Sequence, residues 1–486
     1  MKKNILYTLA LLLGLFFINS CENVLEEDVY SELDPDGLFN DIIGAEAVLH
    51  AAYGESQLNG WNGKSLLNLE EWCTDIEWET GGGENRTAVQ MINFTWDAST
   101  GWITDLMWRG PFRGVRDANT ILDNIEESTL SDSEKKLIRA EARFVRATEY
   151  YYMYTYFGPV PLRTSASQEM ELPRASEQEM LTFLETEFSE IIADLPDPGD
   201  EKLYGRAHKG AATAFLCKFY LASKQWQKCA DAASDLINMN YYELYPDYRE
   251  LFKVENERNK EYIWVHQAVV EGPGNNYING AFPINFSIEP KSGFTWTSNM
   301  RNWAAQYRLY DSFYNSFEEG DQRKDLIISE FINKKGETVS LLNANNTRSF
   351  KWWPDVNAQG NDHGNDIPQI RYADILLAKA EALNELNGPN QESIDLINLV
   401  RDRANLEDIS VADFASKEEL RDHILNERGW EFYSERKRRQ DLIRHGKFIS
   451  SAHERGITNA QDFHVRMPIP QVEIDANPMC EQNPGY

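Results

Sequence analysis

The sequence predicts a mostly α-helical protein, in which a helical scaffold carries large loop-rich insertions and a few short strands. Three observations support this fold class. Several long stretches place apolar residues at three- and four-residue steps, the spacing of one helix face. Gly and Pro end these stretches, and the segments between them are rich in Gly, Asn and aromatic residues. With 42% apolar residues the chain can bury a large core, and we expect residues 36–486 to form a single domain.

The predicted helices follow in chain order. Ser133 to Gly158 ends at Pro159, since proline cannot continue a helix, and Ser176 to Pro196 opens with a Ser-x-x-Glu capping box. Two helix pairs then combine small alanines with bulky aromatic residues, which is similar to tetratricopeptide hairpins. These pairs are His208 to Asn240, joined near Ser223 to Gln225, and Ala373 to Gly388 with Ser393 to Leu406. Ser416 to Gly446 is predicted to be a further pair or one bent helix.

Three insertions interrupt the scaffold, at residues 57–101, 266–303 and 333–370. They are too aromatic to be disordered, so we expect ordered loops presented by a helical frame. Tyr262 to Gln267 is expected to be a short strand. The repeated prolines after residue 467 are expected to exclude helix near the C-terminus.

One predicted helix carries an unusual row of acids. Glu427, Glu431 and Glu435 recur every four residues and would repel one another on a helix face. We expect arginines from elsewhere, such as Arg371 or Arg401, to reach them in a partly buried ion network that docks this helix on the scaffold.

Residues 1–20 have the pattern of a secretory signal, with Lys2 and Lys3 followed by a short apolar core, and Cys21 comes directly after them. The residues before Cys21 resemble a bacterial lipobox, so lipidation of Cys21 is expected. An ordinary signal with an incidental cysteine is the alternative. Residues 21–35 would then form an acidic, flexible tether to a membrane, since acyl chains on Cys21 would anchor the protein.

Charge and motifs exclude several function classes. The net charge is −30, which repels phosphate backbones and argues against nucleic acid as a partner. No nucleophile, metalloprotease or nucleotide-binding motif stands in a supporting context, so we expect no catalytic residues, no metal and no cofactor. The sequence leaves open a calcium ion near Asp355 to Asp366 and a disulfide between Cys73 and Cys480.

The aromatic loops point to sugar binding. An exposed Trp or Tyr ring is a flat apolar platform for the C–H face of a sugar, and polar side chains at its rim fix orientation. Trp78, Trp96 and Trp296 lie among Gly, Thr, Ser, Asp and Asn, which favours exposure. The candidate ligand-binding residues are Trp78, Trp96, Trp296, Tyr277, Asp75, Arg86 and Asn299.

Packing in the core is the alternative for each tryptophan, because most tryptophans are largely buried. Five lie in helix- or strand-like patterns and are assigned to packing. These are Trp102, Trp108, Trp226, Trp264 and Trp430.

Three segments together resemble the SusD/RagB family of Bacteroidetes outer-membrane lipoproteins. They are DIPQIRYADILLAKAEALNE from Asp366, ILNERGWEFYSERKRRQDLIRHGKF from Ile424 and the C-terminal MPIPQVEIDANPMCEQNPGY. The segment WRGPFRGVRDANTILDNI from Trp108 also fits. Two positions depart from the family pattern, which often has Gly at position 436 and Trp at position 445, where this chain has Arg436 and His445.

The resemblance implies a lipid-anchored protein on the outside of the outer membrane. Such a protein captures oligosaccharides and delivers them to a SusC-like TonB-dependent transporter, for which it acts as a lid. The alternatives are a glycan-cleaving enzyme on a helical scaffold and a peptide-capturing member of the same family.

Overall fold

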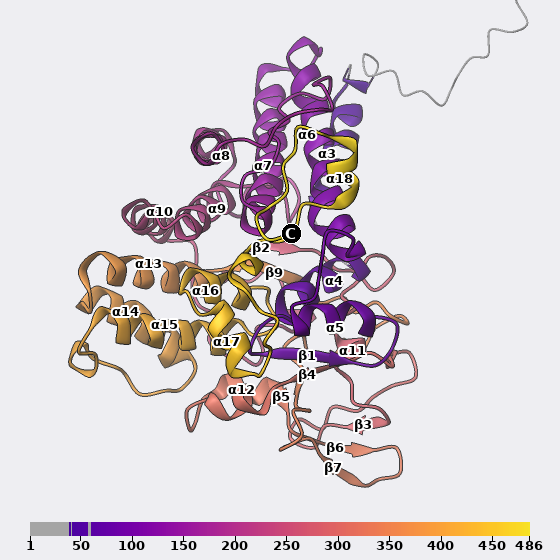
Figure 1. The fold of residues 1–486 in the computed structure, drawn as a ribbon, viewed down its shortest axis with the longest axis vertical. Coiled ribbons are helices and arrows are strands. Elements are labelled where there is room, and N and C mark those ends of the chain that lie inside the picture. The colour runs from indigo at the N-terminus through magenta and orange to yellow at the C-terminus, as the bar shows by residue number, and fades with distance from the viewer. Residues whose placement is uncertain (1–37, 40, 57–59) are drawn as a thin grey trace, which may run out of the picture.

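The structure is a computed structural model that describes residues 38–39, 41–56 and 60–486 (Figure 1). The expectations for the signal in residues 1–20, for Cys21 and for the tether in residues 21–35 lie outside the described residues. Among the helices that the structure describes, none is long and apolar enough to cross a membrane. The expectation of a mostly α-helical fold with few short strands is confirmed.

Three long helices pack together at one end of the molecule, at the top of Figure 1. They are α3 (Ile42–Ser56), α6 (Gly110–Asn124) and α7 (Asp132–Phe157), and the π-helical segment η1 (Ile103–Arg109) leads into α6. Helix α7 begins with a Ser131/Glu134 capping box and ends at Gly158, whose φ of 72° suits glycine. The helix predicted for Ser133 to Gly158 is therefore confirmed.

The helices that follow pack on one another in succession down one side of the molecule. Ser176 caps α8 with the predicted capping box, and the turn predicted near Ser223 to Gln225 separates α9 from α10. Both predicted helix pairs are confirmed, and Ser416 to Gly446 forms two helices. The bounds are α8 (Glu177–Ile191), α9 (Lys209–Ala222), α10 (Trp226–Asn238), α13 (Tyr372–Asn387), α14 (Gln391–Arg403), α15 (Lys417–Phe432) and α16 (Arg438–Arg444).

The break between α15 and α16 contains no glycine or proline. Ser434 and Arg436 adopt left-handed conformations, with φ of 57° and 60°. Glycine adopts this conformation without steric cost. This is a physical reason for the glycine that the SusD/RagB pattern often has at position 436, where this chain has Arg436. The guanidinium of Arg436 pairs with buried Glu70 at 2.8 Å, which helps to hold the bend.

Most of the short strands and loops gather in the lower part of Figure 1, whereas β2 and β9 lie in the middle of the molecule. The antiparallel pairs are β1–β4, β2–β9 and β5–β8. The strands β3, β6 and β7 form a three-stranded sheet in that order. The strand predicted from Tyr262 is confirmed. The bounds are β1 (Glu77–Thr80), β2 (Tyr262–His266), β3 (Phe286–Ile288), β4 (Gln306–Leu309), β5 (Ile327–Ile328), β6 (Glu330–Asn333), β7 (Thr338–Ser340), β8 (Arg348–Ser349) and β9 (Ile367–Arg371).

Two expectations for irregular segments are wrong. Residues 57–101 include two helices, α4 (Gly60–Glu71) and α5 (Asn85–Asn93), because their apolar residues pack against the core. The C-terminal prolines permit a short helix, α18 (Gln471–Ala476), which fits between Pro470 and Pro478. The remaining short helices are α11 (Tyr277–Ala281), α12 (Asp311–Ser316), α17 (Phe448–Glu454), η2 (Ile125–Glu127), η3 (Ile192–Asp194), η4 (Val254–Asn256), η5 (Gln322–Leu326), η6 (Val411–Asp413) and η7 (Asp462–Val465).

Glu427 and Glu431 of α15, with Glu435 in the bend that follows it, lie in a buried ion network, as expected. Arg371 at the end of β9 reaches Glu431 at 2.9 Å and Glu435 at 2.8 Å, and Arg401 of α14 reaches Glu427 at 3.3 Å. Because each carboxylate meets a cation from another element, the network fastens α15 to β9 and α14. Both arginines named from the sequence are confirmed.

Candidate functional site

The candidate site lies at the loop-rich end, where β1 pairs with β4 and places Trp78 opposite Arg308. The turn after β1 passes very close to the segment that leads into β4. A Cβ on Gly81 would lie 2.6 Å from the Ala304 oxygen, and one on Gly82 would lie 2.5 Å from the Ala305 nitrogen. Both glycines also have positive φ, of 90° and 67°, so this close approach requires glycine.

Trp78 is half-buried and is held by three neighbours. Its indole N–H donates to the Asn345 oxygen at 2.8 Å. The guanidinium of Arg308 lies 5.1 Å from the ring centroid, and Tyr310 stacks beside the ring with centroids 6.3 Å apart. These contacts fix the ring at the surface without covering it completely.

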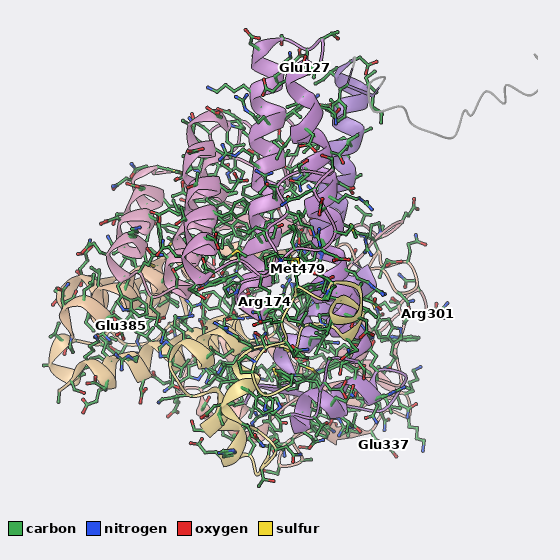
Figure 2. All side chains as sticks on the ribbon, turned by 45° about the horizontal axis from the view of Figure 1, so that its top comes forward. Glu127, Arg174, Arg301, Glu337, Glu385 and Met479 are labelled. Atoms are coloured by element: carbon green, nitrogen blue, oxygen red, sulfur yellow. The ribbon has the colours of Figure 1, made fainter. Side chains whose placement is uncertain are left out.

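Trp303 is a second half-buried ring at this end, and sequence reasoning did not select it. Its indole N–H donates to the Asn361 side-chain oxygen at 3.0 Å, and its backbone N–H donates to the Asn279 oxygen at 2.9 Å. Arg301, two residues earlier, projects outward at the edge of the molecule (Figure 2). The available signal was its place at the end of SGFTWTSNMRNW, among the same polar residues that favoured Trp296.

A buried charged cluster lies under Trp303. The ammonium of Lys64 is 5.1 Å from the Trp303 centroid and pairs with Glu84, which also accepts from the Tyr307 hydroxyl at 2.6 Å. Burial lowers the pKa of Lys64 to about 8 in spite of Glu84. Burial, with the Glu84 charge, raises the pKa of Glu79 to about 8. Uncompensated burial of charge is costly, so the pairing with Glu84 stabilises a lysine beneath the aromatic surface.

Trp296, Asn299 and Arg86 lie where a ligand could reach them. Trp296 is half-buried, with the ammonium of Lys334 at 4.2 Å from its centroid. Asn299 is exposed, but its amide nitrogen donates to the Ala358 and Val356 oxygens at 2.8 and 3.1 Å. Arg86 is exposed on α5. Asn299 therefore joins the segment of Trp296 and Trp303 to the loop of residues 356–361.

The expected exposure of two other aromatic rings is wrong. Trp96 is only 3% exposed, because its ring packs on Phe94 and His464 and its N–H donates to the Tyr486 hydroxyl at 2.9 Å. Tyr277 is 1% exposed and donates to buried Glu77 at 2.6 Å. A sugar cannot stack on rings that lie in the core.

Asp75 is half-buried and makes a two-point ion pair with Arg438, with both N–O distances at 2.8 Å. Burial alone would raise the pKa of Asp75, but Arg438 outweighs it and lowers the pKa. This carboxylate is therefore engaged in joining α16 to the segment before β1.

The tryptophans assigned to packing all contact the core. Trp108, Trp264 and Trp430 are buried, and Trp102 and Trp226 are half-buried against it. Cys73 and Cys480 are buried and unlinked. No group of three His, Cys, Asp or Glu residues in the described part of the chain could hold a metal ion. The Asp355 carboxylate accepts the backbone N–H groups of Asn357 and Gly364 instead.

Comparison with known proteins decides the family. The model of the SusD family matches residues 223–486, and a second model, described as starch-binding associating with outer membrane, matches residues 25–221. The chain belongs to the SusD family. Among curated proteins it is similar to SusD-like protein P25 of Formosa agariphila, at 25% identity over 100% of this chain and 99% of that protein. It is 24% identical to the starch-binding protein SusD of Bacteroides thetaiotaomicron, over 87% of this chain and 85% of that protein.

Solved structures of SusD-like proteins share the fold. A SusD homolog from Bacteroides thetaiotaomicron has a TM-score of 0.80 at 23% identity, over 94% of this chain and 99% of that one. A laminarin binding SusD-like protein has a TM-score of 0.76 at 23% identity, over 92% of this chain and 100% of that one. Surface glycan-binding protein A from Bacteroides thetaiotaomicron, in complex with laminarihexaose, has a TM-score of 0.73 at 20% identity, over 90% of this chain and 99% of that one.

Proposed function

We propose that this SusD-family protein is a cell-surface glycan-binding lipoprotein that captures oligosaccharides at its loop-rich end. The observation that carries the proposal is a group of half-buried tryptophans at that end, which includes Trp78, Trp296 and Trp303. Relatives named for binding starch and laminarin support the same ligand class.

The proposed binding chemistry uses one face of each ring. A cation lies near each of them: Arg308 at Trp78, Lys334 at Trp296 and Lys64 at Trp303. These contacts hold the rings in place, so little side-chain freedom is lost when a sugar stacks on a ring. Asn361, which contacts Trp303, and the exposed Arg86 and Arg301 are the polar groups that we propose bind the sugar hydroxyls.

The proposed site breaks no bond. We propose that the captured oligosaccharide is handed to a SusC-like TonB-dependent transporter in the outer membrane, to which lipidated Cys21 would tether the protein. Residues 1–20 would be removed as a signal peptide, residues 21–35 would be the tether and residues 36–486 the binding domain.

Affinity electrophoresis tests the binding proposal. The protein is run in native gels that contain starch, laminarin or other polysaccharides, and the same mixtures are assayed for new reducing ends. Retardation without new ends supports binding. Steady release of reducing ends would identify a glycan-cleaving enzyme instead, and an absence of retardation on every polysaccharide would favour a peptide-capturing protein.

The anchor and the partner are tested separately from binding. Cys21→Ala should release the protein from the outer-membrane fraction and abolish labelling by a radioactive fatty acid. Purification from solubilised membranes should recover a TonB-dependent transporter in a stoichiometric complex. Fractionation of the Cys21→Ala variant with the membrane as before would refute the anchor without affecting the binding proposal.

A further inference from the structure

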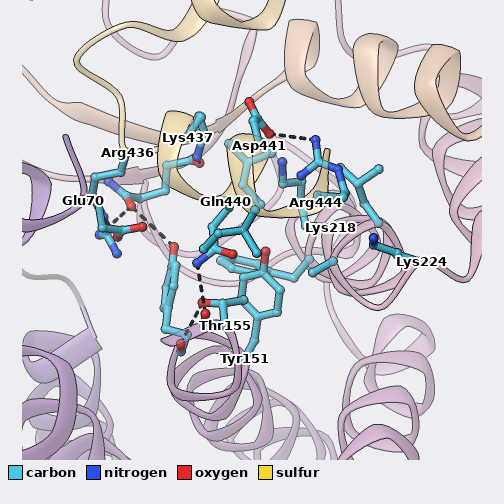
Figure 3. A pocket seen from close by; sticks show the side chains of 17 residues that line it. Glu70, Tyr151, Thr155, Lys218, Lys224, Arg436, Lys437, Gln440, Asp441 and Arg444 are labelled. Carbon is cyan, nitrogen blue, oxygen red and sulfur yellow. Dashed lines mark hydrogen bonds and ion pairs between the residues drawn. The ribbon is translucent and has the colours of Figure 1, made fainter. Parts of the chain in front are cut away.

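A cavity of about 180 Å³ lies between α7, α9 and α16 (Figure 3). We call it the α7–α16 cavity. Tyr151, Tyr152 and Thr155 of α7 form one wall, and Gln440 and Arg444 of α16 form another. The lining also includes Phe215 and Lys218 of α9, Gln369 and Ile370 of β9, and Arg436 and Lys437.

The lining is cationic in a strongly acidic protein. Five basic side chains face the cavity, against the two acids Glu70 and Asp441. Most of the cations have a carboxylate partner: Lys218 meets Asp374 at 2.7 Å, Arg436 meets Glu70 at 2.8 Å, and Arg444 meets Asp441 at 2.8 Å. These pairs belong to the buried network that joins the helices.

Lys437 differs from these cations. Its ammonium donates to the main-chain oxygen of Gln369, and no carboxylate lies within 4 Å of it in the described residues. An ammonium group has three N–H donors, so two remain for a ligand. The pKa of Lys437 is lowered to about 8, mainly by burial and further by repulsion from Lys218 and Arg436, although Asp374 and Glu435 act in the opposite direction. An anion in the cavity would relieve both effects.

Two further groups suit an anion. The hydroxyl of Tyr151 has no hydrogen-bond partner in the described part of the chain, although the residue is only 8% exposed. Lys224 lies in the turn between α9 and α10, is exposed, and also lines the cavity. It lacks a carboxylate partner among the described residues, and its charge would attract an anion toward the cavity.

The shape of the cavity narrows the ligand class. Phe215, Leu221 and Ile370 make part of the lining apolar, which an inorganic ion would leave unfilled. An apolar cavity of roughly 150 Å³ accepts a molecule the size of benzene. We propose that the α7–α16 cavity binds a small organic carboxylate, whose charged end pairs with Lys437 and Tyr151 and whose body lies against the apolar wall.

Calorimetry with matched probes tests this proposal. Benzoate and glucuronate are titrated into the purified protein at neutral pH and constant ionic strength, beside neutral benzamide and glucose and beside inorganic phosphate. At least one carboxylate should bind, and its neutral partner should bind at least about tenfold more weakly, since a hydrogen bond to a charged group contributes that much. Equal binding of the neutral partner, tighter binding of phosphate, or no binding of either carboxylate would overturn the proposal.

Variants connect binding to the named residues. Lys437→Met should weaken carboxylate binding roughly tenfold or more, and Tyr151→Phe by a smaller factor. Lys335→Gln removes an exposed lysine of the β6–β7 turn and serves as the matched control. Unchanged affinity in Lys437→Met would refute the assignment.

A measurement on the unaltered protein covers the case in which Lys437→Met does not fold. Reductive methylation followed by mass spectrometry reports the accessibility of each lysine. Saturating carboxylate should protect Lys437 and leave Lys335 reactive. Equal methylation of Lys437 with and without the probe would show that the carboxylate binds elsewhere.

Discussion

Arg371 and Glu435 form a two-point ion pair in the interior, with Nε 2.8 Å from Oε2 and Nη2 2.8 Å from Oε1. The same guanidinium also contacts Glu431 at 2.9 Å. Arg371 closes β9 and Glu435 lies in the bend after α15, so one side chain connects the central strand pair to the C-terminal helices.

Removal of this guanidinium should be strongly destabilising. In Arg371→Met, Glu431 and Glu435 lose a buried partner, and we expect the free energy of unfolding to fall by about 3–5 kcal/mol. Urea denaturation followed by circular dichroism measures it. Arg139→Met, which removes an exposed ion pair with Glu126, should cost less than about 1 kcal/mol. Equal losses in the two variants would contradict a structural role for the network.

The buried ion network also predicts that the stability of the protein depends on pH. Burial alone would raise the pKa of Glu431, but Arg403 and Arg371 outweigh it and lower the pKa from 4.5 to about 2. Because the folded pKa is depressed, this contribution is present above pH 4.5 and is lost as the pH falls through about 2. It is on the order of 3 kcal/mol.

Urea unfolding at a series of pH values between 4.5 and 2 checks this dependence. Glu431→Gln should show a shallower loss of stability over that window than the unaltered protein. The control Glu337→Gln, at an exposed position labelled in Figure 2, should keep the original slope. An unchanged slope in Glu431→Gln would assign the acid sensitivity to other carboxylates.

The glycine turn offers a test of the candidate site that leaves every ring intact. Gly82→Ala should displace the segment before β4, because its Cβ would meet Ala305 and its φ is 67°. We expect a loss of about 1–3 kcal/mol in stability and weaker glycan binding. Gly83→Ala is the control in the same turn, since nothing lies within 4 Å of its Cβ. Equal stability and equal glycan binding of the two variants would show that the turn after β1 does not require glycine at position 82.

Substitutions of the tryptophans at the loop-rich end should weaken glycan binding, whereas substitution of a buried tryptophan should lower stability. Trp303→Ala, Trp296→Ala and Trp78→Ala should each weaken glycan retention, by roughly 1–2 kcal/mol for a ring that makes a central contact. Trp226→Phe, on α10 among the helical repeats, is the control that should retain binding. Trp96→Phe should lower stability with binding intact, since it removes the hydrogen bond to Tyr486. Full retention in all three alanine variants would place the glycan elsewhere.

The cysteines provide a simple chemical check. Burial raises the pKa of the Cys73 thiol to about 12, and a thiol reacts through its thiolate. We expect Cys73 to resist a thiol reagent in the folded protein and to react fully in urea, which mass spectrometry can follow. Fast modification of the folded protein would show that the core around Cys73 opens.

The sequence by itself determined the local features. Apolar spacing and capping boxes located α7, α8, α9 and α10, because a helix is specified by residues within a few positions of one another. The repulsion within the acidic row also required arginines from elsewhere, and the structure supplied Arg371 and Arg401. A break within Ser416 to Gly446 was predicted, but its position at Ser434 and Arg436 was not, since this segment contains neither glycine nor proline and is held by long-range pairing with Glu70.

Only the tertiary structure decided which rings face solvent. Trp96 is buried by a hydrogen bond to Tyr486, 390 positions away, and Tyr277 by one to Glu77, 200 positions away. Polar neighbours in sequence say nothing about such distant partners, so two expected surface rings lie in the core while Trp303 joins the surface. Exposure is a property of the packed whole, whereas periodicity is a property of a short segment, and that difference separates what the sequence could predict from what it could not.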